Sequence, residues 1–183
     1  MLRKNSKGMT ALHMAIRSNS CQMVKLLFIR DHKSEEAVDS VLKNPTKIDD
    51  IKGNLSPKTV KMLSAQNLRN MTPLISSVDH GNYEIFRFII ELCIHVQKTM
   101  PSHPVLDDII DVKDEKSETA ILKSVRMGRL QMIFTFLHLI GPTNMIGYNS
   151  VTHVDQTGKN ILHHAVINKS KDLISRFVAL DTD

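Results

Sequence analysis

The sequence is short of aromatic residues and of cysteine. Aromatic side chains make up only 4% of the 183 residues and Trp is absent, so Leu, Ile, Val and Met must fill the interior, as in helix-on-helix packing. The two cysteines, Cys21 and Cys93, lie in apolar helical patterns and form no Cys-x-x-Cys pair. This context predicts buried free thiols and gives no support to a zinc or redox site.

Long apolar runs are also missing. No apolar stretch reaches the ~20 residues that a membrane span needs, and no apolar h-region follows the charged start of the chain. The net charge of +5 is spread along the sequence without a clustered basic stripe. These absences predict a protein without membrane insertion, located in the cytoplasm, the nucleus or both, or the intracellular part of something larger.

The sequence does contain an internal repeat. Four segments, at about 5–30, 67–92, 114–139 and 155–180, share a polar turn, an apolar helix, a short break and a second apolar helix. The residues expected to open the first helix of each are Thr10, Thr72, Thr119 and Asn160. The hydroxyls of Thr10, Thr72 and Thr119 can cap backbone N–H groups of the helix.

The turn before each helix and the break after it have their own signals. Asn5 with Gly8, and Asp155 with Gly158, predict tight turns, because Asx side chains bond nearby backbone and Gly permits positive φ. Gly81 and Gly128 are expected to separate the two helices of their pairs. One helix pair cannot bury its own apolar stripe, so stacked neighbours must do it.

These segments resemble the ankyrin family, whose repeat of about 33 residues carries a Thr-Pro-Leu-His-x-Ala signature. The resemblance is closest at Thr10–His13 and Asn160–His163, whereas Ile75 and Leu122 replace the signature His in the other two segments. It implies one domain over residues 1–183, an all-α ankyrin-repeat solenoid. We expect about four helix-turn-helix repeats with short β-hairpin loops and long insertions.

The insertions are expected where the spacing exceeds one repeat. Residues 31–66 are either one long excursion or a degenerate repeat, with short helices predicted at Ser34–Leu42 and Pro57–Leu63; we favour the excursion. Loops are predicted around Gln97–Val105 and Gly141–Ser150. The apolar ends carry no evident polar cap, which favours a piece of a longer array, with a short natural protein as the alternative.

No motif in the sequence indicates an enzyme. His13 and His163 take the signature position, where ankyrin repeats use His to tie neighbouring hairpins and helices, so a structural role is expected. The other histidines show no His-x-x-x-His spacing, and no nucleophilic triad or phosphate-cradling loop is recognisable. We therefore predict no catalytic residue, no metal site and no cofactor.

The resemblance implies that partners dock on the hairpin tips and on the concave face of the inner helices. Several apolar residues fall on positions where a solitary solenoid would be polar, which favours an adaptable methionine-rich protein-binding groove. The predicted partner-binding residues are Met9, Met14, Arg17, Arg69, Met71, Asp79, His80, Lys116, Lys123, Arg126, Met127, Lys159, His164 and Ile167.

The predicted partner is another protein, with no small-molecule substrate. The long insertions are similar to those in inhibitors of NF-kappa-B, which favours a regulatory inhibitor or adaptor of a signalling protein or transcription factor. A cytosolic ankyrin segment of a channel or scaffold is the alternative. Nucleic-acid binding is disfavoured because no aromatic residues interleave the candidate basic strip. That strip comprises Lys4, Lys7, Arg17, Lys123, Arg126 and Arg129.

Overall fold

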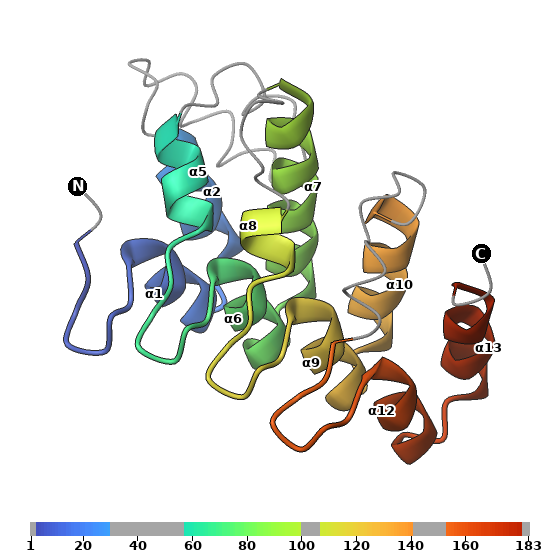
Figure 1. Ribbon diagram of the computed structural model, residues 1–183. Helices are drawn as coiled ribbons and strands as arrows, with labels where there is room; N and C mark the ends of the chain where they lie inside the picture. Colours follow the sequence, from blue (N-terminus) through green and yellow to red (C-terminus); the bar gives the residue numbers. More distant parts are fainter. Residues whose placement is uncertain (1–2, 30–56, 100–106, 141–152, 181–183) are drawn as a thin grey trace.

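The computed structural model describes residues 3–29, 57–99, 107–140 and 153–180, and within these ranges all regular secondary structure is helical. The helices are α1 (Ala11–Arg17), α2 (Cys21–Ile29), α5 (Pro57–Leu63), α6 (Pro73–His80), α7 (Tyr83–Thr99), α8 (Asp107–Ile110), α9 (Ala120–Arg126), α10 (Leu130–Ile140), α12 (Ile161–Ile167) and α13 (Lys171–Leu180). Figure 1 shows α1, α6, α9 and α12 in one row, α2, α7, α10 and α13 in a second row, and four turns projecting to one side. The predicted all-α ankyrin-repeat solenoid is confirmed.

The four turns share one set of hydrogen bonds. The Asx residue that opens each turn accepts two backbone N–H groups through its Oδ1, as Asn5 does from Lys7 (2.9 Å) and Met9 (3.0 Å). Asn67, Asp114 and Asp155 repeat this pattern. The loops are hairpin-shaped, but no residue of the described ranges forms a β-strand.

Backbone conformation repeats as well. The fourth residue of every turn has a positive φ, which two glycines adopt at Gly8 and Gly158, and Asn70 and Ser117 adopt in the other repeats. Asx and other small polar residues tolerate this conformation better than branched ones do. The expected Gly turns are thus one case of a conformation that all four repeats share.

Each inner helix begins at a capping side chain. Thr10, Thr72, Thr119 and Asn160 each accept the backbone N–H of the residue three positions later. The chain leaves each inner helix through a residue of positive φ nine positions after the cap, either Asn19, Gly81, Gly128 or Lys169. The helix starts predicted at Thr10, Thr72 and Thr119 and the breaks predicted at Gly81 and Gly128 are therefore confirmed. Asn160, Asn19 and Lys169 have the same roles in the remaining repeats.

Neighbouring turns are joined by backbone hydrogen bonds. Lys7 O accepts the N–H of Leu68 (3.2 Å), and Arg69 O accepts that of Glu115 (3.0 Å). Lys116 O accepts the N–H of Gln156 at 3.1 Å. Because the same two turn positions pair each time, each repeat follows the last in a constant register despite the unequal lengths of chain between them.

The core lies between the two rows of helices and between successive repeats. Inner helices pack in the order α1, α6, α9 and α12, and each contacts its own outer helix. The equivalent residues Ile16, Val78 and Val125 are fully buried by the following repeat, whereas Val166 of the fourth repeat is 59% exposed. Stacking, and not the single helix pair, buries the apolar face.

His13 ties the first two repeats together. Its Nε2 lies 2.9 Å from Met71 O, so this nitrogen carries the proton and donates, while Nδ1 accepts the hydroxyl of Thr10 at 2.8 Å. Burial lowers the pKa of His13, although the bond to Met71 raises it, and the imidazole is held neutral. The role expected of His13 is confirmed. His163 bonds only Asn160 among the described residues.

Other local predictions have mixed outcomes. The helix predicted at Pro57–Leu63 is confirmed as α5, but α7 continues to Thr99, so the predicted loop cannot begin at Gln97. Ser34–Leu42 and Gly141–Ser150 fall outside the described residues. Cys93 is a buried free thiol, as expected, and burial raises its pKa to about 12, whereas Cys21 is only half-buried.

Gly8 provides a test of the turn-to-turn contact. A Cβ on Gly8 would lie 2.8 Å from the backbone N of Leu68, whereas Gly158 has a similar positive φ and open space around it. We expect Gly158→Ala to lower the free energy of unfolding by about 1 kcal/mol, through backbone strain alone. Gly8→Ala should cost about 2–4 kcal/mol, since a clash is added to the strain. Urea unfolding measures both, and equal losses would contradict the contact.

Candidate functional site

The turn carboxylates of the third and fourth repeats have a second task. Asp114 and Asp155 use Oδ1 within the turn, which leaves Oδ2 to bind a basic side chain nine residues later. Asp114 Oδ2 lies 2.7 Å from Lys123 Nζ, and Asp155 Oδ2 lies 2.8 Å from His164 Nε2. In these two repeats an ion pair or charged hydrogen bond therefore locks the turn onto its inner helix.

Lys123 is the centre of a buried charge cluster. Its side chain is 1% exposed, and its ammonium group lies 3.2 Å from Asp79 and 3.6 Å from Glu118, in addition to Asp114. Asp79 comes from α6, whereas Lys123 comes from α9. A buried charge is tolerated only when it is paired, so this cluster fastens the second repeat to the third.

Two arginines complete the charged network around this cluster. Arg126 Nε and Nη2 both bind the carboxylate of Glu118, the second at 3.0 Å, and this bond raises the pKa of Arg126. Arg69 Nε binds Glu115 Oε1 at 2.6 Å and Arg69 Nη1 lies 3.7 Å from Asp79. Both arginines keep guanidinium surface in contact with solvent beside the buried cluster.

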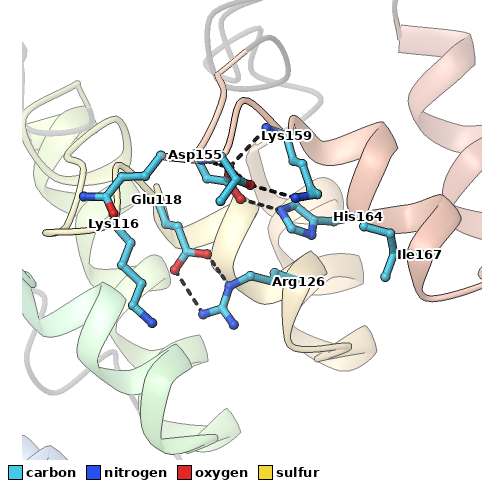
Figure 2. A pocket seen from close by; sticks show the side chains of 9 residues that line it. Lys116, Glu118, Arg126, Asp155, Lys159, His164 and Ile167 are labelled. Carbon is cyan, nitrogen blue, oxygen red and sulfur yellow. Dashed lines mark hydrogen bonds and ion pairs between the residues drawn. The ribbon is translucent and has the colours of Figure 1, made fainter.

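An open pocket of about 400 Å³ lies between the third and fourth repeats, on the side of the turns and inner helices. Figure 2 shows its residues converging from the two turns, from α9 and from α12. The lining consists of Lys116, Glu118, Arg126, Asp155, Gln156, Thr157, Lys159, His164 and Ile167. We call it the repeat 3–4 pocket. It combines basic side chains, carboxylates that are hydrogen-bonded within the protein and one exposed aliphatic group.

Asp155 is the most strongly hydrogen-bonded acid in this pocket. Burial alone would raise the pKa of its carboxyl. Hydrogen bonds from the Thr157 hydroxyl (2.7 Å), the Lys159 N–H (3.1 Å) and the His164 imidazole together hold the pKa well below its ordinary value. The carboxylate therefore stays ionised and shapes the wall of the pocket; its acceptor sites are already engaged.

The pocket brings together five of the predicted partner-binding residues. They are Lys116, Arg126, Lys159, His164 and Ile167. The other predicted residues that reach the surface are spread along the earlier repeats. Met14, Arg17, Arg69 and His80 are exposed, and Met9, Asp79 and Met127 are half-buried.

Three of the predicted contact residues are not exposed. Met71 and Lys123 are each 1% exposed, and His164 is 6% exposed. Met71 packs in the core beneath the second turn, and its carbonyl oxygen accepts a hydrogen bond from His13. Lys123 is surrounded by carboxylates. The expectation that Met71 and Lys123 present a surface to a partner is wrong. His164 reaches the pocket only through its edge, because Asp155 holds its ring.

The candidate basic strip is interrupted. Lys123 is buried and Arg126 is paired with Glu118, while Arg129 has a guanidinium group that packs against Gly81. Within the described ranges, no cluster of His, Cys, Asp and Glu has the arrangement of a metal site. None of the described helices is long and apolar enough to cross a membrane.

Sequence analysis overlooked the acids that organise the pocket. Asp155 is predicted only as a turn residue, and Glu118 falls on a predicted hairpin tip but not among the predicted partner-binding residues. A signal for the first was present, because the two repeats with Asp at the turn, Asp114 and Asp155, have Lys123 and His164 nine positions later. The repeats with Asn at the turn have uncharged residues there, Met14 and Ser76.

The buried cluster yields a stability prediction. Lys123→Met preserves most of the side-chain volume but leaves three carboxylates without their shared cation, and this should cost about 3–5 kcal/mol of unfolding free energy. Lys116→Met is the matched control, since that side chain is exposed, and should change stability by less than about 0.5 kcal/mol. Urea unfolding of the two variants gives the comparison. A loss below about 1 kcal/mol for Lys123→Met would show that the cluster is not holding the repeats together.

Comparison with known proteins agrees with this architecture. Residues 7–46 match the family model described as ankyrin repeat. No curated protein matches the chain. The matched residues include the later part of the first turn, α1 and α2, and the other three segments repeat the same turn bonds, caps and helix pairs. The match and this shared geometry support an ankyrin-repeat fold for the described residues.

Proposed function

We propose that this chain binds a partner protein on the face formed by its turns and inner helices, as a regulatory inhibitor or adaptor of a signalling protein or transcription factor. Ankyrin repeats are in general protein-interaction modules. The observation that carries the proposal is the repeat 3–4 pocket, where five residues selected for their positions in the repeat converge around one open surface. The inhibitor or adaptor role rests on fold-level analogy.

Exposed apolar side chains on the inner helices support this surface. Met14 on α1 is 43% exposed and Ile167 on α12 is 57% exposed. Exposed basic residues also lie on the turns and inner helices, among them Arg17, His80 and Lys116. Apolar contacts within a polar rim are typical of protein-binding sites.

The pocket is poorly suited to a small-molecule substrate. Small-molecule sites are enclosed and bury most of the surface of their ligand. The repeat 3–4 pocket lies open to solvent, and Lys116, Arg126 and Lys159 form much of its wall. Such a surface suits a side chain or short segment of a larger partner, because the partner can bury most of its interface on the surface around the pocket.

Two apolar positions on opposite rows of helices test the proposal. Ile167→Glu places a charge on the inner face, whereas Val178→Glu does the same on outer helix α13, where Val178 is 47% exposed. We expect a partner retained by the wild-type chain in affinity capture from lysate, read by mass spectrometry, to be reduced about tenfold or more by Ile167→Glu, since a charge is buried without a counter-ion. Val178→Glu should retain it.

Circular dichroism and urea unfolding would establish that both variants fold like the wild-type chain. A partner lost equally with both variants, or retained equally by both, would show that the inner-helix face is not the working surface. The two substitutions are matched in charge and in approximate exposure, so general effects on solubility cancel in the comparison.

A further inference from the structure

We propose that the repeat 3–4 pocket recognises acidic side chains, so that its partner presents a segment in which Asp or Glu adjoins an aliphatic residue. The inference rests on the proposed function and narrows it to one partner chemistry. It comes from the balance of hydrogen-bond donors and acceptors in the pocket.

The carboxylates that line the pocket are already engaged within the protein. Glu118 accepts hydrogen bonds from Nε and Nη2 of Arg126 and lies 3.6 Å from Lys123 Nζ. Asp155 accepts two backbone N–H groups, a hydroxyl and the His164 imidazole. A basic ligand would therefore compete with the internal partners of these carboxylates.

The cationic groups have donors to spare. An ammonium group has three N–H donors and a guanidinium group has five. Lys116 Nζ has no hydrogen-bond or ion-pair partner among the described residues, and Arg126 directs only Nε and Nη2 to Glu118. Lys159 Nζ donates to the Thr157 hydroxyl at 2.9 Å and has further donors. An incoming carboxylate would satisfy donors that the protein itself leaves open.

The arrangement of these groups gives the ligand a direction. In Figure 2 the amino end of Lys116 and the guanidinium group of Arg126 lie toward one end of the pocket, whereas Ile167 lies on the side of α12. A planar guanidinium can donate two parallel hydrogen bonds to a carboxylate, and a nearby ammonium group adds a positive charge that attracts it without a fixed geometry. The partner's acid is thus expected at Lys116 and Arg126, with its aliphatic neighbour against Ile167.

An acidic peptide fits this pocket better than a nucleic acid does. The lining contains no Phe, Tyr or Trp on which a base could stack, and Asp155 holds the ring of His164. Glu118 and Asp155 in the wall would repel the closely spaced phosphates of a nucleic-acid backbone. The basic strip that would follow such a backbone is interrupted where Lys123 is buried and where Arg126 is paired with Glu118. A single carboxylate can approach the cations between those acids.

The test uses the complete chain and a fluorescein-labelled peptide of alternating Glu and Leu, measured by fluorescence anisotropy at low salt. The comparison ligands are the same peptide with Gln for every Glu and a single-stranded oligodeoxynucleotide. The variants are Lys116→Gln, Lys116→Glu and the control Lys7→Glu, which makes the same charge change at the equivalent turn position of the first repeat.

We expect the Glu peptide to bind and the Gln peptide to bind at least tenfold more weakly. Lys116→Gln should weaken the Glu peptide by about fivefold and Lys116→Glu by about tenfold, while Lys7→Glu changes it by less than twofold. Added salt should weaken the binding as well.

Equal weakening by Lys7→Glu and Lys116→Glu would overturn the inference, because it would indicate general attraction to a basic protein. Equal binding of the Glu and Gln peptides, or binding of the oligodeoxynucleotide alone, would overturn it too. None of these results depends on the capture experiment with Ile167→Glu. A partner lost with Ile167→Glu but unaffected by Lys116→Glu would leave the interaction module standing and remove only its proposed preference for acids.

Discussion

The structure depends on one repeated contact, the backbone hydrogen bond between successive turns. Lys7 with Leu68, Arg69 with Glu115 and Lys116 with Gln156 all join the same two turn positions. The segments that connect the repeats differ in length, yet each turn meets the next in the same register. Because an inner helix is capped directly after every turn, this register also sets how the inner helices stack and which of their side chains reach the common face.

Charge then distinguishes one part of that face from another. An Asp in place of Asn at the turn adds an acceptor that binds a basic side chain on the inner helix, and this happens twice, with Lys123 and with His164. In the third repeat the result is a buried cluster that fastens α6 to α9. In the fourth it accompanies an open pocket whose acids are bonded internally and whose cations keep donors to spare. The same pairing of a turn Asp with a basic side chain is therefore part of a buried ion cluster in the third repeat and part of a candidate binding surface in the fourth.

Much of the fold could be predicted from the sequence because the local signals agree. The caps Thr10, Thr72 and Thr119, the turns and the apolar stripes each require only neighbouring residues, and they lie where they are expected. Asn160 caps the fourth inner helix in the same way. Exposure could not be predicted in the same way. Met71 and Lys123 stand at turn and inner-helix positions that face outward in a single repeat, but stacking covers Met71 and three carboxylates surround Lys123. Those partners come from residues as far apart as Asp79 and Glu118, beyond any local pattern.

Amide hydrogen exchange at the turn tips, resolved by NMR, tests the central claim about register most directly. The N–H groups of Leu68, Glu115 and Gln156 lie on exposed turns and should nevertheless exchange slowly, because each donates to the preceding turn. Ser6 holds the equivalent position in the first repeat, and the account predicts that it exchanges faster than the other three by about tenfold or more, or ~1.4 kcal/mol of protection. Exchange at a common rate in all four would show that the turns are not hydrogen-bonded to one another and that another contact sets the register.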